Sequence, residues 1–203
     1  MIKKTELILI RHGETEWNSQ LRMQGHSNSN LSPAGLLQIG ALGQWMKNVS
    51  FDHIYSSDSL RARQTAEAII KYSGHTLNLD QRLREKNLGI FEGLTTEEAR
   101  EHNPEIFRLF KTEGSQYVID EGESTQQLLD RTLEAIEVIR QRHHQKRVLV
   151  VTHGGVVRVL MKHTLGLDIG APTRFLIQNT GLFRLIWEDK WMVAQMGGIS
   201  HLE

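Results

Sequence analysis

The chain has 203 residues, and its 24 lysines and arginines balance 24 aspartates and glutamates, so the formal net charge at pH 7 is zero with neutral histidines. Zero net charge excludes a global electrostatic field that would hold the protein on nucleic acid or on an anionic membrane, and it favours a small-molecule ligand. The chain has no cysteine, which excludes disulfides, thiolate nucleophiles and cysteine-ligated metals.

The length is sufficient for one well-filled core, so we predict a single domain over residues 1–203, present as a monomer or a homodimer. The apolar stretch before Arg11 is too short for a signal peptide, and no segment approaches the length of a membrane span. The expected compartment is the cytoplasm.

The first predicted elements alternate between strand and helix. Residues 7–10 are a short run of branched apolar residues, which predicts a buried strand. Ser32 and Pro33 then supply an N-cap and a first-turn proline for a helix that is expected to end near Lys47. Residues 52–55 form a second strand candidate.

A second helix is predicted to follow that strand. Ser57 and Asp58 are its candidate N-caps, and Gly74 is its expected end. Arg61 therefore falls in the first turn of this helix.

Two capping boxes mark the next helices. Thr95-x-x-Glu98 and Ser124-x-x-Gln127 both have the pattern, and the second opens a long helix with one apolar face.

The last third of the chain repeats the alternation. Residues 148–151 predict another buried parallel strand, a helix is expected to run to about Leu165, and residues 182–186 and 191–196 predict a closing hairpin. We therefore predict an α/β fold with three α/β/α layers, a mostly parallel central sheet and an antiparallel edge near the C-terminus.

The candidate catalytic residues lie where two predicted strands end. Arg11-His12-Gly13 follows the first strand, and His153-Gly154-Gly155 follows the strand at 148–151. Ligands of α/β sheets collect beyond the carboxyl ends of the strands, so both histidines are expected to meet in one pocket. Glycine after each histidine lets the backbone approach an oxyanion closely, which suits phosphate. By this reasoning either histidine could attack phosphorus.

Phosphoryl transfer spreads negative charge over three oxygens, so the site needs several fixed donors. Arg11 and Arg61 can each offer a planar fork to two oxygens. The leaving oxygen also needs a proton, which a carboxylic acid in a partly apolar setting would supply. Glu85, in a glycine-punctuated stretch with apolar neighbours, is the best candidate, and Glu14 and Glu92 compete with it.

With these residues identified, the sequence resembles the histidine phosphatase superfamily, in the branch of cofactor-dependent phosphoglycerate mutases and their phosphatase relatives. The resemblance spans nearly the whole chain. The segments that carry it, in order, are Arg11-His12-Gly13-Glu14-Thr15-Glu16-Trp17-Asn18, Gln24-Gly25, Leu31-Ser32-x-x-Gly35, Tyr55-Ser56-Ser57, Arg61-Ala62-x-Gln64-Thr65-Ala66, Glu85 with Gly89, Gly122-Glu123-Ser124 and Thr152-His153-Gly154.

The resemblance implies a mechanism in which His12 is phosphorylated while Arg11, Arg61 and His153 hold the phosphoryl oxygens. It gives Glu85 the acid/base role in a two-step path that needs no metal and no cofactor. It also implies further contacts to phosphate or substrate from Asn18, Gln24, Gly25, Arg63 and Gly154.

The chain departs from many relatives at two places. His26 and Asn28 stand where tryptophan and aspartate are common, and Asp120-Glu121-Gly122 replaces a proline-led approach to Glu-Ser. If the two added carboxylates face the pocket mouth, they would disfavour polyanionic substrates.

Two alternatives to a phosphatase follow from the same residues. A mutase would protect the phosphoenzyme from water, but the stretch 95–121, where mutases carry an inserted segment, is short here, and this favours hydrolysis. A non-catalytic module could instead keep the pocket to bind a phosphorylated ligand. The presence of all five candidate catalytic residues argues against it.

Overall fold

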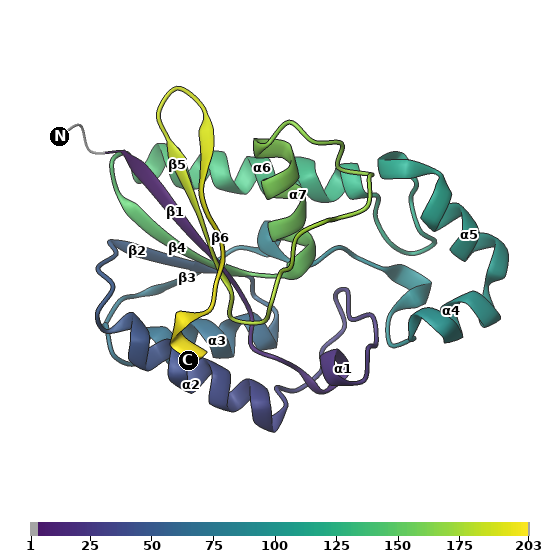
Figure 1. Ribbon diagram of the computed structural model, residues 1–203, viewed down its shortest axis with the longest axis horizontal. Helices are drawn as coiled ribbons and strands as arrows, with labels where there is room; N and C mark the ends of the chain where they lie inside the picture. Colours follow the sequence, from purple (N-terminus) through teal and green to yellow (C-terminus); the bar gives the residue numbers. More distant parts are fainter. Residues whose placement is uncertain (1–3, 203) are drawn as a thin grey trace.

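The computed structural model describes residues 4–202, which build a six-stranded sheet of order β3-β2-β4-β1-β5-β6 (Figure 1). The pairs β1·β4, β2·β4 and β2·β3 are parallel, whereas β5 pairs antiparallel with β1 and with β6. The strands are β1 (Thr5–Arg11), β2 (His53–Ser56), β3 (Leu77–Leu79), β4 (Arg147–Thr152), β5 (Leu182–Trp187) and β6 (Trp191–Gly198). The predicted α/β class, with its antiparallel edge near the C-terminus, is confirmed.

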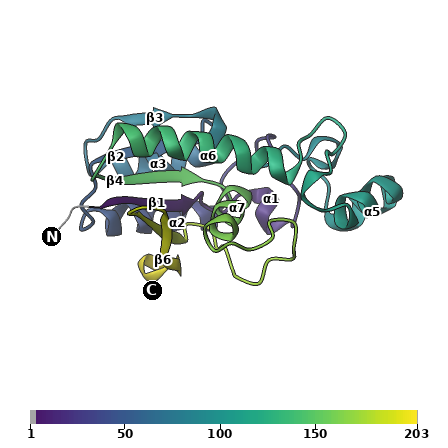
Figure 2. The ribbon, with the colours of Figure 1, turned by 90° about the horizontal axis from the view of Figure 1, so that it is seen from above.

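Helices cover both faces of this sheet (Figures 1 and 2). They are α1 (Glu16–Ser19), α2 (Pro33–Met46), α3 (Leu60–Ile70), α4 (Thr96–His102), α5 (Pro104–Thr112), α6 (Thr125–Arg142) and α7 (Gly154–Thr164), with 3-10 turns at Gln81–Leu83, Gly89–Phe91, Gly114–Gln116 and Ser200–Leu202. No helix within residues 4–202 is both long enough and apolar enough to cross a membrane.

The central strands are apolar on both sides, as predicted for buried parallel strands. In β1, Leu7 and Leu9 pack on one face with α6 and α7, whereas Ile8 and Ile10 pack on the other with α2 and α3. Successive side chains of a strand point to opposite faces, so a continuous apolar run fills both layers. Each fully buried leucine or isoleucine contributes about 1.5–3 kcal/mol relative to an exposed one.

The N-termini of α2, α4 and α6 are capped by the side chains that the sequence indicated. Ser32 caps α2 through the amide of Gly35, and the predicted boxes Thr95–Glu98 and Ser124–Gln127 both form. These three predictions are confirmed.

The predicted caps of the helix that carries Arg61 are wrong. Ser59, not Ser57 or Asp58, is the N-cap of α3, and its side chain makes no capping bond. The Asp58 carboxylate is instead engaged by Arg84, and Ser57 lies against His153. Both side chains thus have partners distant in the sequence, and Ser57 also bonds to Ser59 itself.

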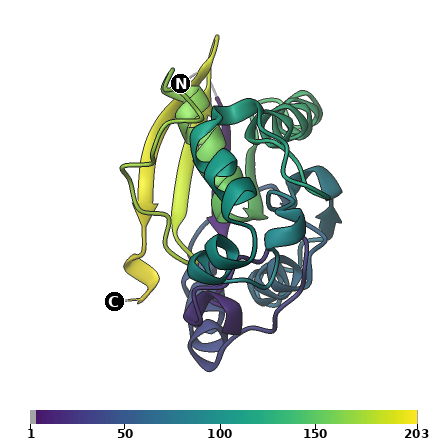
Figure 3. The same ribbon diagram turned by 90° about the vertical axis from the view of Figure 1, so that its right-hand side faces the viewer.

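A small satellite core supports the stretch between Glu85 and α6. Phe91, Ala99, Phe107 and Ile119 form its buried centre, separate from the two cores that flank the sheet. Helices α4 and α5 thereby form a compact unit across the end of the sheet at which β1 and β4 terminate (Figures 1 and 3). The short stretch 95–121 therefore forms a folded cover, and three of its residues, Phe110, Lys111 and Gly114, line the largest cavity at this end of the sheet.

Candidate active site

A cavity of about 760 Å³ lies at the carboxyl ends of β1 and β4. The two strands run in register, with Arg11 opposite Thr152, so the residues that follow them emerge side by side. The His12 amide continues the pairing by donating to the Thr152 carbonyl over 3.0 Å. The two histidine-glycine motifs therefore meet, as the sequence predicted, and of the two histidines His12 lines the cavity whereas His153 lies behind it.

The hydrogen bonds of His12 define which of its ring nitrogens can attack. Nδ1 lies 2.7 Å from the carbonyl oxygen of Gly13, and since a carbonyl only accepts, Nδ1 carries the proton. Nε2 is then unprotonated, and it accepts from Nε of Arg61 over 3.3 Å. The one lone pair of Nε2 is thus engaged by a long hydrogen bond, which a bound phosphoryl group would have to replace, and His12 lines the cavity.

The electrostatic surroundings keep this imidazole neutral. Burial lowers the pKa of His12 well below its usual value, and the charges of Arg61 and Arg11 lower it further, while the bond to Gly13 opposes them. A neutral imidazole is the form that acts as a nucleophile. His12 is therefore ready to attack at neutral pH.

His153 lies beside the first histidine, with the two ring centroids 5.2 Å apart. Its Nε2 lies 2.9 Å from Oγ of Ser57, and its buried Nδ1 has no partner among the described residues. Burial, followed by the charge of Arg61, lowers the pKa of His153 well below its usual value. A neutral ring whose Nε2 accepts from Ser57 has a free Nδ1–H, which a phosphoryl oxygen could accept.

Arg61 is nearly fully buried at the start of α3. Its two terminal nitrogens donate to the carbonyls of Ser27 and Gly25 over 2.9 and 2.8 Å, so the guanidinium is held with Nε toward His12. Burial lowers the pKa of Arg61 to about 10, which leaves it charged at neutral pH. It is a fixed cation beside the candidate nucleophile.

Arg11 approaches the same site from the end of β1. Nη1 donates to the carbonyl of Ile177 over 2.7 Å, while Nε is buried without a partner among the described residues. Burial lowers the pKa of Arg11, and the negative charge of Glu85 raises it in part. The unused donors of the fork can bind an oxyanion.

The three candidate acids have different surroundings. Glu14 accepts from the hydroxyl of Ser32, and Glu92 accepts from the amides of His26 and Ser27, so both organise loops. Glu85 alone among the three lines the cavity. Its carboxylate is oriented by the amides of Gly155, at 3.0 Å, and Lys86, at 2.8 Å. Of the three alternatives left open by the sequence, only Glu85 is placed beside the nucleophile's cavity.

Four of the five further contacts implied by the resemblance line the cavity, namely Asn18, Gln24, Gly25 and Gly154. Arg63 does not line it. Its side chain is about half exposed and pairs with Glu67 on the same helix over 3.4 Å.

The segment before β5 contributes positioning groups that the sequence analysis did not identify. The Asn179 side chain donates to the carbonyl of His12 over 2.9 Å, and the Thr180 amide donates to the carbonyl of Arg11 over 3.0 Å. Thr180 adopts φ +57°, which is uncommon outside glycine. The turn-forming Asn-Thr-Gly triplet is the only local signal that could have indicated this role.

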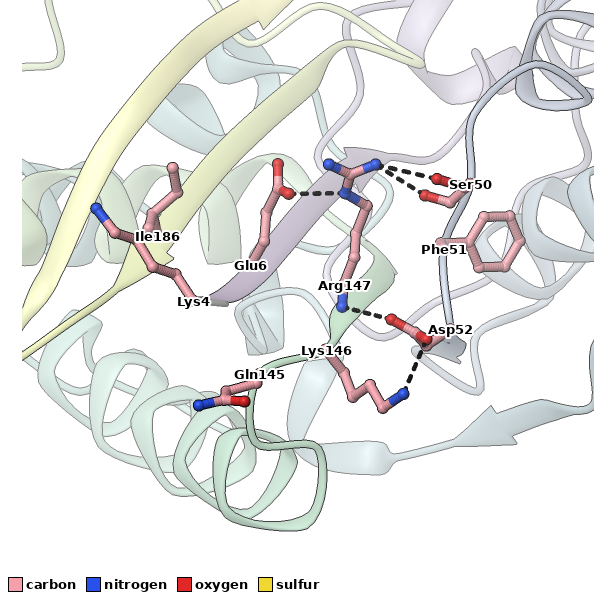
Figure 4. A pocket seen from close by; sticks show the side chains of 9 residues that line it. All are labelled: Lys4, Glu6, Ser50, Phe51, Asp52, Gln145, Lys146, Arg147 and Ile186. Atoms are coloured by element: carbon pink, nitrogen blue, oxygen red, sulfur yellow. Dashed lines mark hydrogen bonds and ion pairs between the residues drawn. The ribbon is translucent and has the colours of Figure 1, made fainter. Parts of the chain in front are cut away.

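A second cavity, of about 460 Å³, opens at the other end of the central strands (Figure 4). Its charged groups are all paired: Arg147 binds Glu6 through its side chain and Asp52 through its backbone amide, Lys146 also binds Asp52, and Lys4 binds Glu188. It lies at the amino ends of β1 and β4, away from both histidine motifs. The chemistry therefore belongs to the larger cavity.

Comparison with known proteins agrees with this geometry. A family model described as histidine phosphatase superfamily (branch 1) matches residues 7–197. The chain is 36% identical over 201 residues to phosphoglycerate mutase-like protein 4 of Arabidopsis thaliana, covering 98% of this chain and 87% of that protein.

Two solved structures are similar over almost the whole chain. YhfR of Bacillus stearothermophilus has a TM-score of 0.88 at 35% identity, covering 98% of this chain and 100% of that one. A mutant phosphoserine phosphatase from Entamoeba histolytica, solved in complex with phosphoserine, has a TM-score of 0.87 at 27% identity, with coverage of 98% and 100%. The chain belongs to branch 1 of the histidine phosphatase superfamily.

Proposed function

We propose that this chain, as a single domain, hydrolyses small phosphomonoesters through a covalent phosphohistidine at His12, with Glu85 as the proton donor. One observation carries the proposal: His12 has its protonated Nδ1 tied to Gly13 and its Nε2 lone pair beside Arg61 in a cation-lined cavity. A neutral imidazole whose Nε2 lone pair can exchange a long hydrogen bond for phosphorus, next to donors for three oxygens, suits attack on phosphorus.

In the first step, Nε2 of His12 forms a bond to phosphorus as the ester P–O bond breaks. Glu85, in its acid form, gives its proton to the leaving alcohol oxygen. Arg11, Arg61 and Nδ1 of His153 hold the phosphoryl oxygens, where their charge and dipoles oppose the developing negative charge.

In the second step, water attacks phosphorus and the Nε2–P bond breaks. The Glu85 carboxylate takes a proton from that water and returns to its acid form, so the cycle closes with release of inorganic phosphate. The donors that bound the ester oxygens also bind the phosphate product.

Hydrolysis is favoured over phosphoryl transfer between substrates because the stretch 95–121, where mutases carry an inserted segment, is short in this chain. The cavity volume of about 760 Å³ lies within the range of roughly 300–1,000 Å³ that is usual for small-molecule sites, which suits a small metabolite. The similar proteins include one named for a mutase and one named a phosphatase, so kinetics must separate the two reactions.

The test is a panel of phosphoglycerates, phosphoserine, sugar phosphates and nucleotides, scored for release of inorganic phosphate and for interconversion of 2- and 3-phosphoglycerate. We expect net phosphate release and an acid-labile phosphoprotein in rapidly quenched samples. Both should vanish in His12→Ala and persist in His163→Ala, which removes an exposed histidine from α7.

Full activity in His12→Ala, or no acid-labile phosphoprotein in the wild type, would overturn the mechanism. Interconversion of phosphoglycerates that outpaces phosphate release would assign the chain as a mutase. Binding of a phosphomonoester with no turnover on any substrate would assign it as a binding module.

A further inference from the structure

The cavity extends beyond the phosphate-binding residues along α7. Gly154 begins this helix at the phosphate end, and Arg158 and Lys162 follow at intervals of four residues, all three lining the cavity. Residues four apart share a helix face and are displaced by about 6 Å along the axis. The helix therefore places cations at increasing distance from His12.

The opposite wall of this extension comes from α5 and the loop at Glu85. Lys111 and Phe110 of α5 line it, together with Lys86. The ammonium group of Lys86 lies 5.1 Å from the ring centroid of Phe110, and that of Lys111 lies 4.9 Å from it. The three side chains thus form one cluster in the wall of the cavity.

The charge of the lining is strongly unbalanced for a chain of zero net charge. Glu85 is its only carboxylate, whereas its cationic side chains are Arg11, Arg22, Arg61, Lys86, Lys111, Arg158 and Lys162. Arg11 and Arg61 belong to the phosphate end, and Arg22 is neutralised by Glu98. The excess of positive charge lies in the extension.

The cations of the extension differ in how they are bound. Lys162 donates to the carbonyls of Ile169 and Ala171, and so holds the loop that lines the cavity. Lys86 donates to the hydroxyl of Thr125 over 3.0 Å. Within residues 4–202, Lys111 and Arg158 have neither a hydrogen bond nor an ion pair from their charged groups, which leaves both available to a ligand.

Burial and neighbouring cations both disfavour the charged form of the lysines in this cluster. Burial, opposed by the charges of Glu123 and Glu85 and assisted by the charge of Lys111, lowers the pKa of Lys86 to about 8. Burial also lowers the pKa of Lys111, as do the charges of Arg100 and Arg158. An anion between these groups would relieve the repulsion.

We propose that Lys111 and Arg158 bind a second anionic group on the substrate, one helical turn or more from the phosphoryl group that His12 attacks. This inference rests on the proposed function and specifies its substrate class: a small phosphomonoester with a carboxylate or a second phosphate at its other end. The expectation that Asp120 and Glu121 repel such substrates does not hold, because both are exposed and neither lines the cavity.

The test uses matched substrates that differ only at the far end: butyl phosphate, 4-(phosphonooxy)butanoate and butane-1,4-diol bisphosphate. The kcat/KM of the wild type should be about tenfold or more higher for the carboxylate and for the bisphosphate than for butyl phosphate. The reason is that charge-assisted hydrogen bonds to the second anion are strong. The double variant K111Q/R158Q should lose most of this ratio. The preference should also weaken as salt is added, since both side chains are exposed.

Lys190→Gln is the matched control, because it removes a charge from the exposed turn between β5 and β6 and should leave the ratio unchanged. A larger preference for the carboxylate or for the bisphosphate identifies which anion the site takes. Equal kcat/KM for all three compounds in the wild type, or an unchanged ratio in the double variant, would overturn the subsite and leave the proposed function standing. Hydrolysis of none of the three would count against the proposed function itself.

Discussion

The backbone amide of Gly155 donates to Oε2 of Glu85 over 3.0 Å, so the first turn of α7 holds the candidate acid in place. A Cβ atom added at Gly155 would lie 2.0 Å from Oε1 of the same carboxylate. The close approach leaves no space for a side chain at this position. The position of the Glu85 carboxylate therefore depends on glycine at residue 155.

Gly155→Ala should displace Glu85 and impair proton donation without unfolding the protein, because the clash falls on the end of a flexible side chain. General acid catalysis contributes roughly 10²–10⁴-fold, and we expect a loss in kcat of about 10- to 100-fold for alkyl phosphates. For 4-nitrophenyl phosphate, whose leaving group needs little protonation, the loss should be small. Steady-state kinetics across leaving groups measure the difference.

Gly40→Ala, on the exposed face of α2, is the matched control for this substitution. A Cβ atom there would meet nothing within 4 Å, and Gly40 does not line the cavity. An equal loss for good and poor leaving groups in Gly155→Ala, or the same loss in both variants, would count against a role for Gly155 in holding the acid.

Arg61 and Arg63 provide a second matched pair, on the same helix. Arg61→Lys removes the planar fork beside His12 and should lower kcat/KM by about 10²- to 10³-fold, as for the loss of a transition-state donor. Arg63→Lys should change it by less than about twofold, since Arg63 lies outside the cavity and an exposed ion pair contributes little.

Arg61→Lys should also lower the melting temperature, because the buried carbonyls of Gly25 and Ser27 lose their donors. A comparable loss of activity in Arg63→Lys would show that Arg63 reaches the substrate after all. Thermal melts and initial rates on the two purified variants measure both effects.

The contrast between these arginines shows how far the sequence could define the site. The histidines and Arg61 are placed by local signals, namely strand ends and a helix start, and the structure brings them together. Two residues apart on a helix is a rotation of about 200°, so a buried Arg61 already implies an outward Arg63. The resemblance implied a contact that helix geometry disfavours.

Other features depend on contacts that are distant in the sequence. Glu92 lies outside the cavity, where it binds the amides of His26 and Ser27, and Ser57 does not cap the helix because it faces His153. The placement of Lys111 depends on the satellite core beneath α5. No pattern within a short window specifies such pairings, whereas the caps at Ser32 and Ser124 are local and could be predicted.

The buried histidines predict how stability depends on pH. The pKa of both His12 and His153 is lowered in the folded state, so below about 6.5 the unfolded chain binds more protons than the folded one. The free energy of unfolding should therefore fall as the pH drops from 6.5 toward 5, by up to about 1.4 kcal/mol per pH unit for each histidine. Urea unfolding at a series of pH values measures the slope.

Replacing one of the two histidines should reduce this slope. His153→Asn is expected to remove one of the two contributions, whereas His163→Asn, at an exposed position, should leave the slope unchanged. If His153→Asn unfolds with the wild-type pH dependence, buried neutral His153 is not the cause.

The same electrostatics predict the acid limb of the rate profile. Because only neutral His12 can attack, kcat/KM should persist below pH 6.5 and fall once the lowered pKa of His12 is reached. After burial, the charge of Arg61 is the largest cause of that lowering, so Arg61→Gln should raise the pKa of His12 and move the acid limb toward neutral pH. Arg63→Gln, which removes a charge from the same helix but not from the cavity, should leave the limb in place.

The profile must be compared across substrates whose phosphate groups have the same pKa, because phosphomonoesters themselves titrate near pH 6. An acid limb that does not move in Arg61→Gln would mean that the group it reports is not His12.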